Sequence, residues 1–214
     1  MSVSTIPDNH AALHAGFRWL VPERFNIAQV CCARWAQRPD AAQRVAVRNH
    51  APGSAAWSYS YAELQDGANR LSALLRRQGV ARGDRVAIVL PQRFETAVAY
   101  VAVLQMGAVA MPLSTLFGPE ALEYRLQDSA AVVAICDHSA IASLREVRGR
   151  CPQLRCVIGL EAAGALADLD YAAATGRENP AAALVQTAGA EAAILISPAA
   201  PPATPRARCC RTGR

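Results

Sequence analysis

Between residues 61 and 196, short apolar segments alternate with amphipathic ones, and this pattern constrains the fold more than any other feature of the chain. The apolar segments are 85–90, 108–113, 131–136, 155–160 and 192–196. Helical spacing of apolar residues occurs between them, at 94–106, 118–127 and 139–148. Strands that are apolar on both faces and separated by helices are typical of βαβ units. The pattern therefore predicts an α/β fold with a largely parallel sheet and helices on both faces.

Capping residues mark the start of a long helix at the beginning of this alternating region. Ser60 and Glu63 fit a capping box, in which each side chain satisfies a free N–H group of the first turn. An apolar stripe follows from Leu64 to Leu75, and Gly79 predicts the end of the helix. The tripeptide Arg82-Gly83-Asp84 is then predicted to be a turn before the first buried strand.

Three segments differ in character along the chain. Residues 1–24 show no periodicity and predict an irregular lead-in. Residues 25–197 form the predicted domain, which begins with a helix capped by Asn26, with Ile27, Val30, Cys31 and Trp35 on one face, followed by a hairpin over 44–60. Residues 198–214 contain proline and arginine without apolar periodicity, so we expect them to be disordered and to add nothing to a packed sheet.

Charge is concentrated at the end of the chain. All 22 basic residues are arginine, and 18 of them stand against all 17 acidic residues up to Ser197, a net charge of +1. The other four are Arg206, Arg208, Arg211 and Arg214, which bring the total to +5. A nearly neutral body predicts no nucleic-acid partner, because phosphate binding needs a basic surface.

The sequence indicates a cytoplasmic protein without a membrane span. Gln105, Gly107 and Pro112 interrupt the most apolar stretch, residues 98–113, and the first residues do not resemble a secretory signal. Seven cysteines, an odd number, predict buried reduced thiols rather than disulfides. Cys151 and Cys156 have no nearby histidine to complete a zinc site.

Two residues at one strand end are functional candidates. Cys136 ends a predicted strand, and we expect a core thiol there because nothing nearby lowers its pKa. His138 follows that strand, at a position where α/β proteins often place functional groups. Because no partner for it is identifiable, a solvated loop histidine is expected.

The order of several motifs resembles the start of the adenylate-forming superfamily, and acyl-CoA synthetases in particular. The motifs are Tyr61 with Leu64, Gly83–Val86, Pro91, Gly107–Val109 and Pro112-Leu113. Residues 20–197 take part in the resemblance, which concerns the scaffold rather than the chemistry. It implies an AMP-binding N-terminal domain whose parent reaction joins a carboxylic acid to CoA. That reaction consumes ATP, with Mg²⁺ assisting, and releases AMP and pyrophosphate.

The phosphate-binding loop of that family is missing from this sequence. In the family, a strand like 193–196 leads into a loop of the form Tyr-Thr-Ser-Gly-Thr-Thr-Gly-x-Pro-Lys-Gly, whose N–H groups and lysine contact phosphates. Here Pro198-Ala199-Ala200-Pro201-Pro202 stands in its place, and the chain contains no lysine. We therefore assign no catalytic, cofactor-binding or metal-binding residue. We expect no cofactor for this chain and no ligase activity.

A shift of reading frame accounts for the replacement. Synonymous codons for residues 196–211 can be chosen so that one base inserted in the Ser197 codon gives Ile-Tyr-Thr-Ser-Gly-Thr-Thr-Gly-Asn-Pro-Lys-Gly-Ala-Leu-Leu-Pro. Residues 198–214 are therefore interpreted as an out-of-frame tail, in which Cys209 and Cys210 correspond to Leu-Leu. The one-base loss is either real or a sequencing error, and in both cases it accounts for the tail without a role as a nucleic-acid or membrane-binding arm.

Two questions stay open at this point. The chain is interpreted as an inactive fragment of an acyl-CoA synthetase, and the alternative is a non-enzymatic α/β binding module that pairs with a full-length synthetase. The sequence does not distinguish an aliphatic from an aromatic acid for the parent enzyme. The resemblance implies that the acyl pocket is built largely from other segments. The oligomeric state is unknown.

Overall fold

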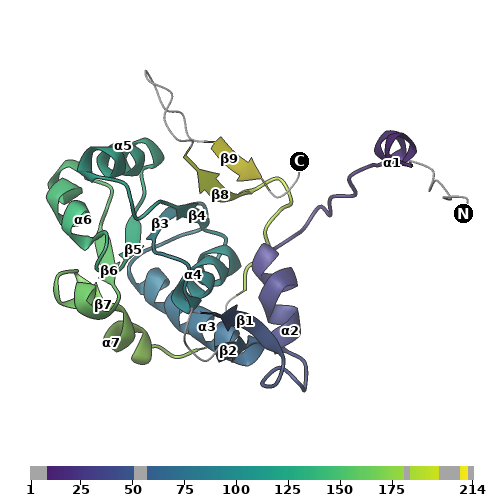
Figure 1. Cartoon of the computed structure of the whole chain (residues 1–214), viewed down its shortest axis with the longest axis horizontal. Helices are drawn as coiled ribbons and strands as arrows, with labels where there is room; N and C mark the ends of the chain where they lie inside the picture. Colours follow the sequence, from purple (N-terminus) through teal and green to yellow (C-terminus); the bar gives the residue numbers. More distant parts are fainter. Residues whose placement is uncertain (1–8, 51–56, 181–183, 198–207, 212–214) are drawn as a thin grey trace, which may run out of the picture.

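A seven-stranded sheet lies at the centre of the fold, and helices cover both of its faces (Figure 1). The computed structural model describes residues 9–50, 57–180, 184–197 and 208–211. The strand order is β7-β6-β5-β3-β4-β8-β9, in which the first six strands are parallel and β9 is antiparallel to β8. A separate antiparallel hairpin, β1-β2, lies beside the helices. The predicted α/β class is confirmed.

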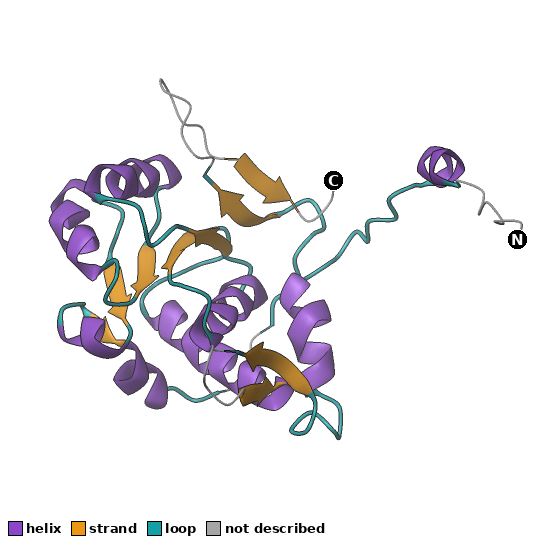
Figure 2. Cartoon of the chain, in the orientation of Figure 1, coloured by secondary structure: helices purple, strands orange, loops and turns teal. Residues whose placement is uncertain are grey.

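The elements alternate along the chain as the sequence pattern predicts (Figure 2). The strands are β1 (Val45–Asn49), β2 (Trp57–Ser60), β3 (Arg85–Val89), β4 (Val109–Pro112), β5 (Val133–Cys136), β6 (Cys156–Gly159), β7 (Leu169–Asp170), β8 (Ala192–Ile196) and β9 (Arg208–Arg211). The α-helices are α1 (His10–Gly16), α2 (Arg34–Ala36), α3 (Tyr61–Arg77), α4 (Phe94–Gln105), α5 (Pro119–Ser129), α6 (Ile141–Val147) and α7 (Tyr171–Gly176). A π-helix (Gln29–Ala33) precedes α2, and 3₁₀ turns cover Arg148–Arg150 and Glu161–Ala165. No helix of the described residues is long and apolar enough to cross a membrane.

Two hydrophobic cores fill the two sides of the sheet. Val86 and Ile88 of β3 pack with α3 and α4, whereas Ala87 and Val89 pack with α5 and α6. This alternation follows from the period of two in a strand, and it buries both faces of β3. Leu71, Leu74 and Leu75, from the stripe of α3, are fully buried in the first core. The prediction of helices on both faces is therefore confirmed.

The predicted helix ends are confirmed where capping chemistry defines them. The Ser60 hydroxyl accepts a bond from the Glu63 N–H at 3.2 Å, and the Glu63 carboxylate accepts one from the Ser60 N–H at 2.7 Å. Gly79, with φ of 77°, follows the end of α3, where a left-handed residue favours glycine.

The helix that follows Asn26 buries a different face from the one that the sequence predicts. Asn26 caps it as predicted, since its side-chain oxygen accepts bonds from the N–H groups of Ala28 at 2.9 Å and Gln29 at 3.3 Å. However, Cys32 is buried and Cys31 is exposed, whereas the pattern placed Cys31 on the apolar face. A π turn holds more residues than an α turn, so a stripe extrapolated with a 3.6-residue period points the wrong residue inward.

Three further elements correct the sequence analysis. The lead-in contains helix α1, which stands away from the body on an extended segment (Figure 1). Strand β7 has only two residues, too few to produce a periodic signal. In the tail, Arg208–Arg211 pairs with β8, because backbone groups at a sheet edge accept any extended segment regardless of its side chains. The statement that the tail adds nothing to the sheet is therefore wrong for these four residues.

Candidate functional site

The strand order places a crevice at the carboxyl ends of β3 and β5. The connection that leaves β3 leads to its neighbour β4, whereas the connection that leaves β5 leads to β6 on the other side. Connections that leave in opposite directions open a crevice above the strand ends, where α/β proteins bind ligands. The loops that border it here are residues 90–93 after β3 and residues 137–140 after β5.

Arg93 connects two carboxylates at this edge of the sheet. Its Nε donates to Glu95 Oε2 at 2.6 Å, and a terminal nitrogen donates to Glu161 Oε1 at 2.7 Å. These bonds raise the pKa of Arg93, the one to Glu95 most, and the bond from Arg93 holds the pKa of Glu161 below its usual range. Glu161 adopts a backbone φ of 52°, which residues other than glycine rarely adopt. The guanidinium therefore fixes the loop after β6 against the loop after β3.

Asp137 is the buried acid of the crevice, with 2% of its surface exposed. Its Oδ1 accepts bonds from the Ser139 N–H at 2.9 Å and the Ser139 hydroxyl at 2.5 Å. These bonds turn the chain at the end of β5 toward α6. The neighbouring His138 keeps 75% of its side chain exposed, and its Nδ1 lies 3.9 Å from Asp137 Oδ2. His138 is thus exposed in a loop as predicted, but Asp137 is a partner that the sequence analysis did not identify.

Cys136 lies one residue before this turn and is fully buried. Burial, and then the charge of Asp137, raise the pKa of its thiol to about 12. A thiol with that pKa is protonated at neutral pH and is a poor nucleophile. The predicted core thiol is confirmed.

Two adjoining hollows lie near this point, the first over the ends of β3 and β4 and the second between β1 and the start of α4. The first has a volume of about 330 Å³ and is lined by Gln92, Ser114 and Thr115 together with apolar residues. The second has about 570 Å³ and reaches the β1-β2 hairpin at Asn49 and His50. Both hollows share three residues, Gln92, Thr96 and Tyr100. Their volumes are those of small-molecule sites, and amide and hydroxyl groups on their walls can orient a bound ligand by hydrogen bonds.

Strand β8 ends at the same edge, next to β4. Ile196 pairs with Arg208, so eleven residues connect β8 to β9. The predicted out-of-frame segment begins here, and residues 198–207 lie outside the described residues.

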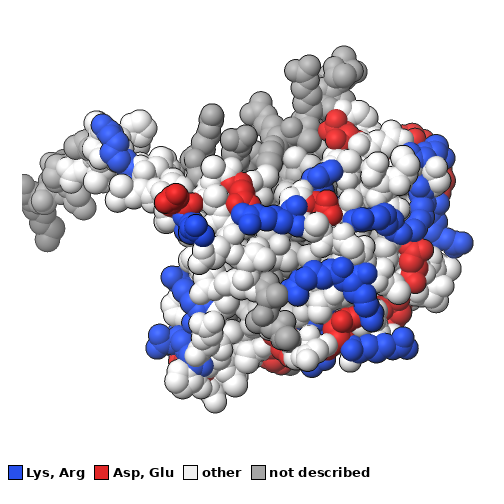
Figure 3. Space-filling view, turned by 180° about the vertical axis from the view of Figure 1, so that it is seen from behind, with Lys and Arg blue, Asp and Glu red and all other residues white. Residues whose placement is uncertain are grey.

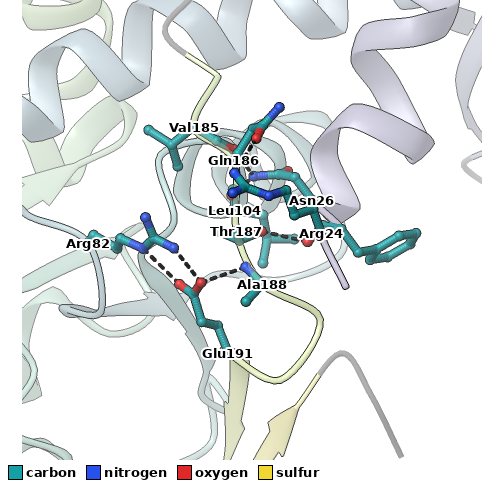
Figure 4. A network of polar contacts seen from close by, with 10 residues as sticks. Arg24, Asn26, Arg82, Leu104, Val185, Gln186, Thr187, Ala188 and Glu191 are labelled. Atoms are coloured by element: carbon teal, nitrogen blue, oxygen red, sulfur yellow. Dashed lines mark hydrogen bonds and ion pairs between the residues drawn. The ribbon is translucent and has the colours of Figure 1, made fainter. Parts of the chain in front are cut away.

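A polar network at the opposite edge holds the start of β8 in place (Figure 4). Arg82 Nε donates to Glu191 Oε2 at 2.8 Å, and the pair has a second contact between Arg82 and Glu191 Oε1. Asn26 donates to the carbonyls of Leu104 and Val185, each at 3.0 Å. The tripeptide that begins with Arg82 is thus a turn, as predicted, and its arginine is engaged in the fold.

Arginine and acidic side chains lie interspersed on the face shown in Figure 3. Ion pairs of the described surface include Arg77–Glu178, Arg150–Glu123 and Arg148–Asp168. Among the described residues, no group of three or more His, Cys, Asp or Glu side chains could hold a metal ion.

The sequence analysis did not identify Arg93, Glu161 or Asp137. The sequence does contain a signal for Asp137 and Glu161, because each directly follows a predicted buried strand. Charged residues in that position come together at one edge of a parallel sheet. The contact between Arg93 and Glu161 had no such signal, since 68 residues separate them and the intervening loops determine their approach.

Comparison with known proteins identifies the family. The AMP-binding enzyme family matches residues 32–207, so the chain belongs to this family. The acetyl-coenzyme A synthetase of Novosphingobium aromaticivorans is 30% identical over 168 residues, which cover 73% of this chain and 25% of the relative. The chain spans about a seventh to a quarter of the length of the acetyl-coenzyme A synthetases of Halorhodospira halophila, Sodalis glossinidius and N. aromaticivorans.

Solved structures agree with this fold. An acyl-CoA synthetase from Brucella canis superposes with a TM-score of 0.79 at 24% identity, covering 94% of this chain and 36% of that protein. The anthranilate CoA ligase AuaEII in complex with anthranoyl-AMP also superposes with a TM-score of 0.79, at 18% identity, covering 89% of this chain and 35% of that protein. The chain is thus an N-terminal fragment of the adenylate-forming superfamily.

Proposed function

We propose that this chain is the first part of an acyl-CoA synthetase, and that it has no ligase activity of its own. In the parent reaction, ATP converts a carboxylic acid to an acyl-adenylate and releases pyrophosphate, and the CoA thiol then displaces AMP. The adenylate makes a poor electrophile reactive, because AMP is a good leaving group. ATP, Mg²⁺ and CoA are therefore cofactors and partners of the intact enzyme.

The connection between β8 and β9 carries this proposal. Its eleven residues leave the carboxyl end of β8, beside the end of β4, where the family places its phosphate-binding loop. A loop of Gly, Ser, Thr and Lys is needed there to surround a triphosphate with N–H groups and positive charge. This connection offers neither lysine nor glycine. The absence of both supports the proposal that the chain does not bind ATP productively.

The reading-frame hypothesis agrees with the length of this connection. In the shifted frame its eleven residues read Tyr-Thr-Ser-Gly-Thr-Thr-Gly-Asn-Pro-Lys-Gly, and β9 reads Ala-Leu-Leu-Pro. Sequencing the gene across the Ser197 codon tests the hypothesis. The hypothesis predicts that residues 196–211 are encoded by the codons that give the phosphate-loop motif after the one-base insertion. It also predicts that the shifted frame stays open and encodes the rest of the enzyme. Unrelated codons would refute it.

An adenylation assay tests the proposed inactivity separately. The purified chain is incubated with ATP, Mg²⁺ and CoA, and with acetate or anthranilate as the acid, while pyrophosphate release and thioester formation are measured. We expect neither product, and the acetyl-coenzyme A synthetase of N. aromaticivorans serves as the positive control. Turnover by the 214-residue chain would contradict the proposal. The two named relatives differ in their acid, so we propose a carboxylic acid without choosing between aliphatic and aromatic ones.

Two parts of the proposal concern the surroundings of the protein. We propose a cytoplasmic location, which free thiols at Cys32, Cys136, Cys151 and Cys156 support because a reducing compartment keeps them reduced. The alternative function, a binding module for a full-length synthetase, predicts that the tagged chain retains such an enzyme in a pull-down. Retention without turnover would favour that alternative.

A further inference from the structure

The N-terminal arm, residues 9–22, is the most apolar exposed segment among the described residues. Leu13, Phe17, Trp19, Leu20 and Val21 keep between 40% and 93% of their surface exposed. Large side chains of this kind rarely remain in water when they are contiguous in a soluble protein, and such a cluster usually marks an interaction site.

The arm does not fold back onto its own domain. Helix α1 has only seven residues and no side-chain cap, so it cannot be stable without a packing partner. The root of the arm is fixed, because the Phe25 N–H donates to the Thr187 carbonyl at 2.8 Å and the Gly189 N–H donates to the Glu23 carbonyl at 2.9 Å. From this root the arm extends away from the body (Figure 1).

A surface hollow with matching chemistry lies between β2, α3, α4 and α7. This acidic hollow has a volume of about 570 Å³. Tyr59 and Phe94 form an apolar wall, with their rings stacked at 3.7 Å. Three carboxylates line the hollow, of which Glu63 is held by the capping box, Asp66 pairs with Arg70 at 2.8 Å and Glu95 pairs with Arg93 at 2.6 Å. Arg70 is the single positive side chain of the lining.

The charges of the arm complement those of the hollow. No carboxylate occurs between Asn9 and Pro22, and Arg18 lies between the aromatic residues Phe17 and Trp19. The Arg18 guanidinium donates to two carbonyls of the arm itself, those of Ala15 at 3.0 Å and Phe17 at 2.9 Å. It can therefore exchange these bonds for a carboxylate without disturbing the domain.

We propose that two copies of this chain exchange arms, each arm docking in the acidic hollow of the other copy. Arg18 lies beside the carboxylates of the hollow, and Phe17 and Trp19 contact its aromatic wall. Each copy offers one arm and one hollow, so a two-fold dimer closes without free sites. The proposal is independent of the ligase assignment.

The contact area is sufficient for a specific dimer. Two aromatic side chains bury roughly 300–500 Å² per arm. Two arms, counted together with the surfaces that they cover, give on the order of 1,200–2,000 Å² in total, which is the usual size of a specific interface.

Sedimentation velocity and light scattering over a range of concentrations test the proposal. We expect a monomer–dimer equilibrium that the combined substitution Phe17→Ser/Trp19→Ser/Leu20→Ser shifts at least tenfold toward monomer. The matched control, Leu116→Ser/Leu166→Ser, removes equally exposed apolar side chains outside the arm and should leave the equilibrium unchanged. A wild-type monomer, or a dimer that survives the arm substitutions, would overturn the proposal.

A charge exchange identifies the docking place. Arg18→Asp and Asp66→Arg should each weaken the dimer, and the two substitutions together should restore it, because the charges are then complementary again. Both side chains are largely exposed. Because Asp66→Arg also removes the ion pair of Asp66 with Arg70, urea unfolding of each variant checks that the domain is folded. A fluorescent peptide of residues 9–22, titrated into a chain that lacks residues 1–21, provides a second measurement. Equal binding of this peptide and a scrambled one, or no restoration by the double substitution, would overturn the docking in the hollow.

Discussion

Replacing Asn26 with alanine should destabilise the domain by about 3 kcal/mol, because one buried amide serves three segments. Its oxygen caps the helix that starts at Ile27, and losing an N-cap costs about 1 kcal/mol. Its nitrogen donates to the carbonyls of Leu104 and Val185, and each buried bond left unmade costs at least about 1 kcal/mol. The Leu104 carbonyl still accepts from the Gly107 N–H, so we use the lower figure for it.

Urea unfolding followed by circular dichroism measures this difference, at low micromolar concentration to keep the chain monomeric. Asn26→Ser retains the cap oxygen and should recover about 1 kcal/mol relative to Asn26→Ala. Asn26→Asp keeps the shape but cannot donate when ionised, so it should be at least as unstable as Asn26→Ser at pH 7. A loss below about 1 kcal/mol for Asn26→Ala, or an Asn26→Asp variant as stable as the wild type, would refute the reasoning.

Three other perturbations follow from the structure. Arg93→Gln should lower stability at neutral pH and have less effect in acid. The pKa of Glu161 is depressed in the folded state, so the stabilisation from its pair with Arg93 is present above the unfolded pKa and is lost as pH falls through the folded pKa. Urea unfolding midpoints at neutral and acidic pH check this. In a Cys209→Ser/Cys210→Ser variant, a thiol reagent at pH 7.4 should label the exposed Cys31 rapidly but Cys32 and Cys136 only on unfolding. Burial raises the pKa of the Cys32 and Cys136 thiols to about 12. Mass spectrometry of the labelled peptides measures the labelling of each thiol. Arg82→Gln should speed amide exchange in β8 but not in β5, and equal changes in both strands would contradict a local role for the Arg82–Glu191 pair.

Local rules predicted the elements that depend on local chemistry. The box of Ser60 and Glu63 fixes the start of α3, and a glycine in the left-handed region fixes its end, so neither depends on distant residues. The buried strands of the sheet were equally clear, because each is apolar on both faces. The π turn before Arg34 was not predictable, since a period of 3.6 residues is assumed when a helical stripe is read.

The candidate site was harder to predict because its contacts are long-range. Arg93 and Glu161 lie 68 positions apart, and nothing in either local sequence selects the other as a partner. The pairing of Arg208–Arg211 with β8 is of the same kind, because backbone hydrogen bonds make the contact and the side chains give no signal. The alternation of apolar and amphipathic segments therefore predicted the sheet better than it predicted the contacts at the edge of the sheet.

The position of β8 explains how this chain can keep the family fold although the sequence after Ser197 departs from the family motif. Strands β3, β5 and β6 pair over four residues each and are buried on both faces, whereas β8 pairs with β4 through a single register position, Ala110 with Ile194. The pairing of the central strands therefore does not depend on β8, and a change of sequence after Ser197 leaves these pairings in place. By the same argument, the loop that would bind phosphate depends on a weakly paired strand, which the Arg82–Glu191 pair and Asn26 hold from the opposite edge. Loss of the exposed Arg82–Glu191 pair should thus affect a restored phosphate site more than it affects the stability of the domain.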